Sequence, residues 1–397
     1  MTSFGAALSD LSPSSPSQQF ISEDHGQGCW AAEVVSMQGF THAPPPNMQA
    51  GWDGGLVNES YRWVEKLVAF EPPFGQWQSA VRDGLLEAGV LPFNGFTYDH
   101  IYGTKVGGTI FDQQGNRHTL EYANPSGLTV LLHASVHKIL FAVEGRKKPK
   151  ARGVVFRDAR GGKHKAYLKR GSKNEIIISA GALGSPQLLM LSGVGPAEHL
   201  KSHNIKPVLH QPQVGQGMSD NPMNAVFIPS PIPAEVSLIQ VVGITRFGSY
   251  IEAAGGASSP SRMFSPEATA EAAFRGGPIS TGHLELRTRN PNENPSLTFN
   301  YFKDSQDLQR CVQGIQTIEK IVESKPFAKF RYESLPWPDT VMTIWHYHGG
   351  CQVGKVVDPD FKVLGVDSLR DIDGSTFNDS PGTNPQATVM MLGRYKG

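Results

Sequence analysis

The sequence predicts an α/β protein, α+β overall, that divides into two domains. A chain of 397 residues and 43.1 kDa is long enough to bury two sizeable cores. Its 43 glycines and 29 prolines indicate many turns and loops, which disfavours a helical bundle. Short β-prone runs alternate with a few amphipathic helical segments, so we expect both element types in one fold.

Residues 1–50 carry the weakest pattern in the chain. The stretch Met1–Gln19 is rich in Ser and Pro and has neither the basic start nor the apolar core of a signal peptide. Elsewhere no apolar run approaches the roughly eighteen residues that a membrane span needs. The sequence as written therefore predicts neither a leader peptide nor a transmembrane segment.

Two packing helices are expected next. Asn58 is a candidate N-cap for a helix over Asn58–Phe70, which carries apolar residues on one face. A second helix is predicted over Gln76–Ala88, and Gly89 would end it. The glycine-rich segment Gly103–Arg117 alternates apolar residues, which indicates irregular strand beside a ligand cleft.

A series of short β-prone runs follows, separated by turn residues. The runs are Leu128–His133, Val136–Val143, Gly153–Arg157, Ala166–Lys169 and Glu175–Ser179. Taken alone, Val136 is an ordinary core residue of a strand. After the last run, Ser185 could cap a helix with Pro186 in its first position, and the small residues before it would let this turn lie close to a cofactor or a neighbouring strand.

The second half of the chain predicts another sheet and another helix. Ala225–Ile251 is apolar and β-prone, and Ser296–Phe302 predicts a strand. Asp307–Val322 predicts an amphipathic helix. The apolar residues assigned to its buried face are Leu308, Val312, Ile315 and Ile318.

Charge and cysteine content restrict the possible partners. The chain has 36 basic and 36 acidic residues, so nothing favours nucleic acid or an anionic membrane, and a small neutral substrate suits it better. Cys29, Cys311 and Cys351 have no metal-ligand spacing, and we expect buried or unpaired thiols and no metal site. The oligomeric state is not indicated.

The last fifty residues hold the strongest candidate site. His346 follows a tryptophan, Asn384 lies 38 positions later, and the apolar run Val363–Leu369 between them predicts a strand. An imidazole titrates near neutrality and suits acid/base work, although a lone His on a strand is more often a satisfied core residue. Asn384-Pro385 would open a helix over Gln386–Leu392, whose amino-terminal dipole favours negative charge.

Three blocks of the sequence resemble the glucose-methanol-choline (GMC) family of FAD-dependent alcohol oxidoreductases, and its plant HOTHEAD-like branch in particular. Gly181–Gly195 fits the second signature of that family, and Trp345–Gly354 and Asp373–Arg394 resemble its carboxy-terminal active-site segments. The resemblance implies a GMC-type FAD-binding domain, with an incomplete Rossmann-like sheet and a β-meander, plus a substrate domain of antiparallel sheet and helices. Val214–Pro222 resembles the turn that leaves the FAD-binding domain.

On this basis the chain divides into four segments. Residues 1–50 would be a divergent or mis-spliced remnant, 51–222 the first part of the FAD-binding domain, 223–340 the substrate domain, and 341–397 the carboxy-terminal part with the active site. Relative to the family, the chain would be truncated at its amino terminus and shortened at Ala253–Arg275 and between Tyr332 and Asp339.

The resemblance also implies the cofactor, FAD, and the residues that hold it. Val136 would meet the adenine, Trp345 the isoalloxazine, and Asp373 and Gly374 the ribityl and pyrophosphate chain. His346, Asn384 and Pro385 would lie at the flavin ring. In this reading His346 takes the hydroxyl proton of an alcohol, Asn384 holds its oxygen, and the flavin accepts the hydride.

The sequence departs from the family in two places. It has no Gly-x-Gly-x-x-Gly, the motif that brings backbone N–H groups to the pyrophosphate at a helix start. Our hypothesis is that Cys29–Gly39 is a frame-shifted or mis-spliced copy of a glycine-rich loop. Relatives also pair a cysteine placed like Cys311 with one about nine residues before the active-site His. This chain lacks that second cysteine, although its presence in relatives implies a secretory setting.

Three functions therefore stay open at this stage. The first is an FAD-dependent oxidoreductase that converts an alcohol to an aldehyde, with a long-chain ω-hydroxy fatty acid as a candidate substrate. The second is an inactive, truncated GMC homologue that binds FAD poorly. A hydroxynitrile lyase is the third and is disfavoured, because the relatives with mandelonitrile lyase activity carry His at the position of Asn384.

Overall fold

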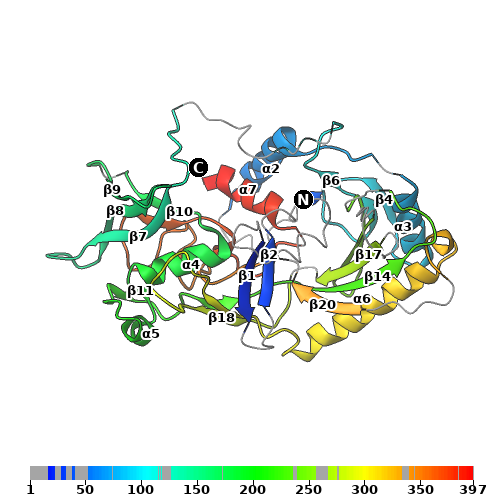
Figure 1. The fold of residues 1–397 in the computed structure, drawn as a ribbon. Helices are drawn as coiled ribbons and strands as arrows, with labels where there is room; N and C mark the ends of the chain where they lie inside the picture. The colour runs from blue at the N-terminus through cyan, green and yellow to red at the C-terminus, as the bar shows by residue number, and fades with distance from the viewer. Residues whose placement is uncertain are drawn as a thin grey trace.

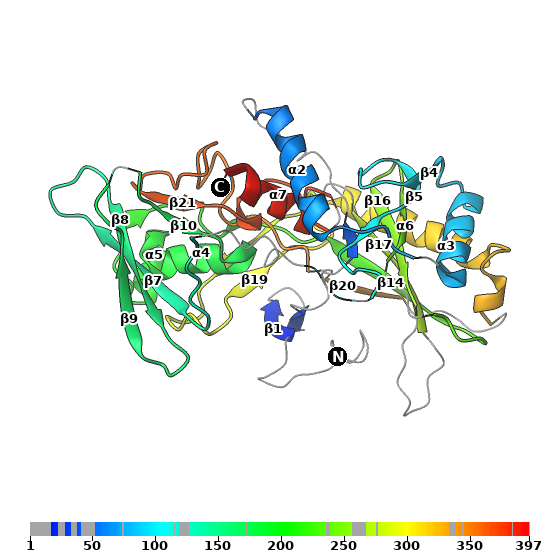
Figure 2. The same ribbon diagram turned by 90° about the horizontal axis from the view of Figure 1, so that it is seen from above.

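A seven-stranded sheet with two helices packed on it forms one end of the protein (Figures 1 and 2). The computed structural model describes residues 17–22, 28–32, 38–40, 52–73, 75–114, 116, 118, 127–171, 173–235, 239–255, 267–274, 277–332, 339–343, 345–382 and 384–396. The sheet runs in the order β20 (Asp339–Thr343), β14 (Pro222–Pro229), β17 (Glu267–Phe274), β16 (Ser249–Ala254), β15 (Val241–Ile244), β5 (Gly103–Val106) and β4 (Phe93–Phe96).

Neighbouring strands of this sheet are antiparallel except β4 and β5, which are parallel. The helices α3 (Gln76–Glu87) and α6 (Ser305–Glu323) pack on it and share a core that contains Trp77, Leu85 and Ile318. The second helix prediction is confirmed, because α3 ends one residue before the predicted end and Gly89 follows it with a φ of 87°.

The other end of the protein holds the meander and a short parallel sheet. The strands β7 (Ser135–Ala142), β8 (Lys150–Arg157) and β9 (Lys163–Tyr167) form the three-stranded meander, and β10 (Ile176–Ile178) pairs in parallel with β21 (Leu369–Asp371). The helix α4 (Gly181–Leu191) packs against β7, and Leu189, Met190 and Ile139 lie in a second core. The strands β11 (Val194–Gly195) and β12 (Leu209–His210) and the helix α5 (Ala197–Ser202) complete this end.

A third sheet of five strands lies between the two ends (Figure 1). Its order is β13 (Gln216–Met218), β18 (Gly282–Glu285), β19 (Ser296–Thr298), β1 (Ser17–Ser22) and β2 (Gly28–Ala32). A separate pair joins β3 (Gln38–Phe40) to β6 (Gly108–Thr109). The frame-shift hypothesis for Cys29–Gly39 stays untested, since residues 33–37 lie outside the described residues.

The helices α2 (Gly54–Val68) and α7 (Gln386–Lys396) are far apart in sequence and lie side by side in both views (Figures 1 and 2). A hydrogen bond of 2.9 Å between the hydroxyls of Tyr61 and Thr388 links them. The predicted N-cap was wrong: α2 begins four residues before Asn58, because the Asp53 carboxylate accepts from the amides of Gly55 and Leu56.

The start of α4 also differs from the prediction. The helix begins at Gly181 rather than at Pro186, and both Ser185 and Pro186 lie inside it. The Asp373 carboxylate explains this, because its Oδ2 accepts from the Gly181 amide at 2.8 Å and from Ser185 Oγ at 2.6 Å. A carboxylate distant in sequence therefore satisfies the first helical N–H group, and Ser185 is not needed as the cap.

Several predicted strands are absent or shorter than expected, and of Ser296–Phe302 only Ser296–Thr298 is a strand. Residues 128–133 form no strand, and Leu128 and Leu132 are 65% and 78% exposed. Within the described residues no strand lies alongside to pair with this run, and a single extended segment cannot satisfy its own backbone groups. In Val363–Leu369 the chain turns at Gly365 and pairs with itself through Val363 and Leu369, so β21 begins only at Leu369.

The buried face of α6 was predicted about one residue out of phase. Ile318 is buried as predicted, but Leu308 and Val312 are 50% and 44% exposed, and Asp307 and Cys311 are buried in their place. The Asp307 carboxylate accepts from the Ile279 and Ser280 amides and from Ser280 Oγ. Burial of this satisfied carboxylate turns the helix, because three hydrogen bonds would be lost if Leu308 took its place.

Truncation of α6 side chains tests this orientation. Ile318→Ala should lower the free energy of unfolding by about 2–4 kcal/mol, because it leaves a cavity in the core. The matched change Leu308→Ala removes a half-exposed side chain and should lower it by less than about 1 kcal/mol. Urea denaturation of both variants measures the difference, and equal losses would mean that Leu308 also faces the sheet.

Candidate active site

Antiparallel pairing of β14 with β20 brings the candidate site together. Pro222 pairs with Thr343, and just beyond the two strands Ser219 and His348 form a further bridge with 2.9 Å hydrogen bonds in both directions. Residues 219–221 therefore lie beside residues 345–348, although more than a hundred positions separate them in sequence. This register places Asp220 and Asn221 against His346.

Both ring nitrogens of His346 have amide partners. Its Nε2 lies 3.1 Å from Asn384 Oδ1, and its Nδ1 lies 3.2 Å from Asn221 Nδ2. The residue is only 3% exposed, and burial lowers its pKa from 6.5 to about 3, an effect that the Asn384 hydrogen bond opposes and that nearby His348 reinforces. The imidazole of the folded protein is therefore neutral at physiological pH.

A buried carboxylate fixes the backbone of His346. Asp220 Oδ1 accepts from the His346 amide at 2.9 Å, and its Oδ2 accepts from the hydroxyls of Tyr301 and Thr343. Burial raises the Asp220 pKa to about 7, and these hydrogen bonds limit the rise. The ring of His346 is thus held from its backbone as well as from its two nitrogens.

This raised pKa predicts a pH-dependent stability. Between about pH 4 and about pH 7 the folded protein keeps a proton that unfolded Asp220 has lost, so this group costs the folded state up to about 1.4 kcal/mol for each unit of rising pH. His346 acts in the opposite direction below about pH 6.5, because its unfolded form binds the proton there.

Asp220→Asn separates the two contributions. The variant loses hydrogen bonds and should be less stable at mildly acidic pH, but the difference from the parent protein should shrink as the pH rises from about 5 to about 7. Thermal or urea unfolding across this range gives the slope. A difference that stays constant would place the Asp220 pKa near its ordinary value.

Asn384 precedes α7 in a left-handed backbone conformation with a φ of 63°, which asparagine adopts more readily than most residues. Its Oδ1 contacts His346, whereas its buried Nδ2 has no hydrogen-bond partner among the described residues. The amide faces the hydroxyl of Tyr250, which stacks on His100 with ring centroids 5.7 Å apart. The contact between His346 and Asn384 thus leaves Asn384 Nδ2 without a hydrogen-bond partner among the described residues, close to the Tyr250 hydroxyl.

Asp373 has a structural task that the sequence did not indicate. Both of its carboxylate oxygens accept hydrogen bonds from the protein, since Oδ1 accepts from the Ser375 amide at 2.7 Å and Oδ2 holds Gly181 and Ser185. The side chain therefore joins the start of α4 to the turn at Gly374–Thr376. A ligand at this turn would meet backbone groups rather than a free carboxylate.

The other predicted cofactor residues lie in different surroundings. Val136, on β7, is 38% exposed, which removes the interpretation that it is a core residue. Trp345 has a φ of 61°, and its amide donates to Thr343 Oγ1 at 2.9 Å. Pro385 precedes α7, and its carbonyl accepts from the Val389 amide at 2.9 Å. Of the predicted set, the structure brings His346 and Asn384 into direct contact.

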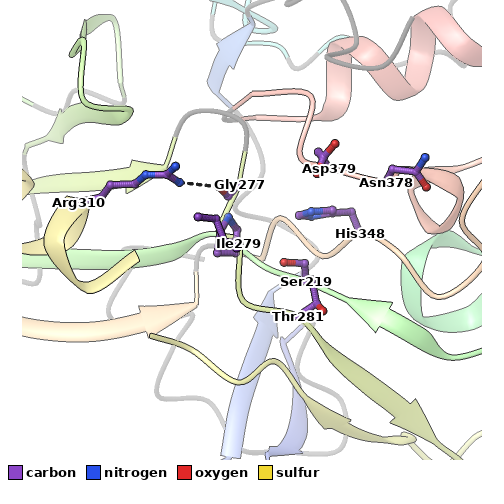
Figure 3. A pocket seen from close by; sticks show the side chains of 9 residues that line it. Ser219, Gly277, Ile279, Thr281, Arg310, His348, Asn378 and Asp379 are labelled. Carbon is purple, nitrogen blue, oxygen red and sulfur yellow. Dashed lines mark hydrogen bonds between the residues drawn. The ribbon is translucent and has the colours of Figure 1, made fainter. Parts of the chain in front are cut away.

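A polar pocket of about 280 Å³ lies beside His348, two residues after His346 (Figure 3). The His348 ring reaches into it, and His348 Nδ1 donates to the His346 carbonyl at 3.0 Å. Its lining residues are Ser219, Gly277, Pro278, Ile279, Thr281, Arg310, His348, Asn378 and Asp379. His346 and Asn384 do not line it, so this pocket adjoins the candidate pair without opening onto it.

Sequence reasoning missed Asp220, Asn221 and Tyr250. The segment Val214–Pro222 was interpreted only as a turn between domains, yet two polar residues directly before a strand-opening proline are a signal that could have drawn attention to it. Tyr250 carries no comparable signal, because a tyrosine in an apolar strand is most often a packing residue. Cys311 and Cys351 are buried thiols that form no disulfide within the described part of the chain, and Cys311 Sγ donates to Asn224 Oδ1.

Comparison with known proteins places these residues in a family context. The GMC oxidoreductase family matches this chain twice, over residues 111–223 and 278–393. Protein HOTHEAD of Arabidopsis thaliana is 45% identical over 480 aligned positions, which cover 100% of this chain and 80% of that protein. The (R)-mandelonitrile lyase-like protein of the same plant is 44% identical over an alignment that covers 96% of this chain and 78% of that protein.

A solved structure supports the fold. The crystal structure of formate oxidase superimposes with a TM-score of 0.78 at 17% identity, covering 96% of this chain and 86% of that one. The mixed α/β architecture with antiparallel sheets is therefore the one predicted from the sequence. Across the helices that the structure describes, none has the length and apolar character to cross a bilayer.

Proposed function

This chain belongs to the GMC oxidoreductase family, and from that premise we propose that it oxidises the CH–OH group of a small-molecule alcohol to an aldehyde with FAD as cofactor. The observation that carries the proposal is the 3.1 Å contact between Nε2 of the buried, uncharged His346 and Asn384 Oδ1. A neutral imidazole and a carboxamide are the groups that can take a hydroxyl proton and hold the oxygen that loses it.

The residues at the flavin-ring end fit this cofactor. Asn384 offers a buried donor without a hydrogen-bond partner, and α7 directs its amino terminus toward the same place, where its dipole favours negative charge. Trp345, Asn384 and Pro385 would hold the ring, Gly374 and the backbone of Asp373 the chain beyond it, and Val136 the adenine. When bound, FAD would supply the hydride acceptor, which no side chain can provide.

The protein's own contribution is to bind and orient the alcohol. Asn384 would hold the substrate oxygen through its Nδ2, and the Tyr250 hydroxyl lies close to that side chain. His346 Nε2 would receive the hydroxyl proton. The ring can do so only in the neutral form that its lowered pKa maintains, and Asp220 keeps the backbone of His346 in place while it does.

The chain lacks the sequence motif that usually binds the pyrophosphate of FAD. The sequence has no Gly-x-Gly-x-x-Gly, so the helix-start cradle that usually binds the phosphates is not supplied by that motif. We therefore expect weaker FAD binding than in a protein with the motif. We also propose that the substrate domain spans residues 223–340, that residues 51–222 and 341–397 form the FAD-binding domain, and that the protein is secreted.

The proposal is tested by adding FAD to the purified chain and removing unbound cofactor. We expect flavin to remain with the protein and aldehyde to form when an alcohol is added. A long-chain ω-hydroxy fatty acid and a short primary alcohol should be compared, because their difference defines the substrate class. A chain that retains no flavin at any FAD concentration would instead be the inactive homologue.

A hydroxynitrile lyase is the second candidate. The 44% identity to a protein named (R)-mandelonitrile lyase-like favours it, and the same His346–Asn384 pair could move a proton at a cyanohydrin hydroxyl. Asn384 disfavours it, because the resemblance places His there in the active lyases. Release of cyanide from mandelonitrile, with no aldehyde formed from simple alcohols, would select this function.

A further inference from the structure

A second asparagine, Asn221, contacts the ring nitrogen of His346 that Asn384 does not contact. It lies in the short connection between β13 and β14 and is fully buried. Its Nδ2 is 3.2 Å from His346 Nδ1 and 3.3 Å from Ser380 Oγ. Asn221 therefore touches both the candidate base and a serine in the loop that leads to Asn384.

Ser380 determines which way the Asn221 amide points. The Ser380 hydroxyl donates its only proton to the Gly382 carbonyl at 2.6 Å. Its oxygen can then only accept, so the Asn221 atom beside it must be the NH₂ group rather than the carbonyl oxygen. The orientation of an amide that is otherwise ambiguous is thus assigned by a neighbour whose proton is already used.

This orientation has a direct consequence for His346. An NH₂ group has no lone pair to offer, so His346 Nδ1 must accept from Asn221. In a neutral imidazole the proton then lies on Nε2, which donates to Asn384 Oδ1 at 3.1 Å. The same arrangement leaves Asn221 Oδ1 and Asn384 Nδ2 buried without hydrogen-bond partners among the described residues.

We infer that Asn221 is a positioning residue that selects the tautomer of His346 and keeps the proton on Nε2 in the free protein. Asn221 Oδ1 and Asn384 Nδ2, the two atoms without partners among the described residues, indicate that the two amides can also take a second orientation. If both amides turned over, Asn221 Oδ1 would accept from Nδ1–H and Asn384 Nδ2 would donate to a bare Nε2.

The tautomer of His346 is a property of the free protein, and only its consequence for catalysis rests on the proposed function. To act as the base, Nε2 must not carry a proton. In the free protein Nε2 is a hydrogen-bond donor, so it could polarise a substrate oxygen but not deprotonate it. To become the base, the ring must release the Nε2 proton to solvent and take one up from solvent at Nδ1. The Asn221 amide, turned over, stabilises this second form.

Nitrogen NMR of ¹⁵N-histidine-labelled protein tests the inference without flavin or substrate. The His346 signals are assigned by their loss in His346→Gln. The parent protein should have a protonated Nε2 and an unprotonated Nδ1. Asn221→Asp is recorded at a pH well above about 7, where the new carboxyl is ionised; an ionised carboxylate can only accept, so the proton should move to Nδ1. A parent spectrum with the proton on Nδ1, or an Asn221→Asp spectrum like that of the parent, would overturn the inference.

Ser380→Ala is the second variant, and it introduces no buried charge. Without the acceptor that orients it, the Asn221 amide can adopt both orientations, so the spectrum should contain a share of the Nδ1–H tautomer. An unchanged tautomer in a folded Ser380→Ala protein would contradict the role of Ser380. If the parent has the expected tautomer but no alcohol is oxidised, the proposed function fails while the inference about Asn221 stands.

Discussion

Replacement of His346 by glutamine is expected to lower aldehyde formation by about a hundredfold to ten-thousandfold in FAD-loaded protein, the usual range for loss of a general base. Glutamine is of similar size and can still hydrogen-bond to Asn384 and Asn221, but its amide cannot take a proton at neutral pH. The fold should therefore persist while the proton transfer is lost. Turnover of a primary alcohol at saturating concentration measures the effect.

The control for this variant is His348→Gln. His348 is as deeply buried as His346, and within the described part of the chain its ring makes one hydrogen bond, from Nδ1 to the His346 carbonyl, which a glutamine amide can replace. We expect a change of no more than a few fold. If both variants lost activity equally, burial of polar groups in this region would explain the loss, and His346 would have no special role in the chemistry.

Substitution of Asn384 should separate its chemistry from its backbone conformation. Asn384→Gly removes the amide and accepts the φ of 63° freely, whereas Asn384→Ala removes the same amide and adopts that φ at a cost of about 1–2 kcal/mol. Both variants should lose about a hundredfold in turnover, since a hydrogen-bond donor to the reacting oxygen is gone. Only Asn384→Ala should also lose stability.

Turnover and urea denaturation of the two variants provide this comparison. Parallel losses of activity with unequal losses of stability would assign Asn384 to the substrate oxygen. If Asn384→Gly kept full activity, the residue would serve mainly to shape the turn before α7. Its role as an orienting group in the proposed reaction would then be withdrawn.

Local sequence patterns predicted the regular elements well where apolar spacing decided them. The helix α3 and the meander lie close to their predicted positions because their packing follows directly from periodic apolar residues. The family and fold class also followed from the sequence, since the blocks at Gly181–Gly195 and Trp345–Gly354 are long and specific. In both cases the information lies within a short stretch of chain.

The errors share one physical cause, which is a polar contact between segments distant in sequence. Asp373 starts α4 earlier than Ser185 would, and the buried Asp307 turns α6 so that Leu308 faces solvent. Neither carboxylate reveals its partners in the sequence. Residues 128–133 form no strand because strand pairing also depends on a distant partner, and the described residues provide none.

The candidate site combines both situations. The residue types and spacing of His346 and Asn384 could be recognised in the sequence. The sequence did not indicate that Asp220 and Asn221 hydrogen-bond to the backbone and the ring of His346. They reach it only because β14 and β20 pair in a particular register. A long-range register of this kind cannot be read from either strand alone.

The most direct test of the oxidoreductase proposal is to mix the FAD-loaded protein with an alcohol in the absence of oxygen and to follow the yellow absorbance of oxidised flavin. If His346 and Asn384 present an alcohol to the flavin ring, the absorbance should disappear at a rate that rises with alcohol concentration, and aldehyde should form in equal amount. A protein that holds FAD, releases cyanide from mandelonitrile and leaves the flavin oxidised with every alcohol tested would contradict this account.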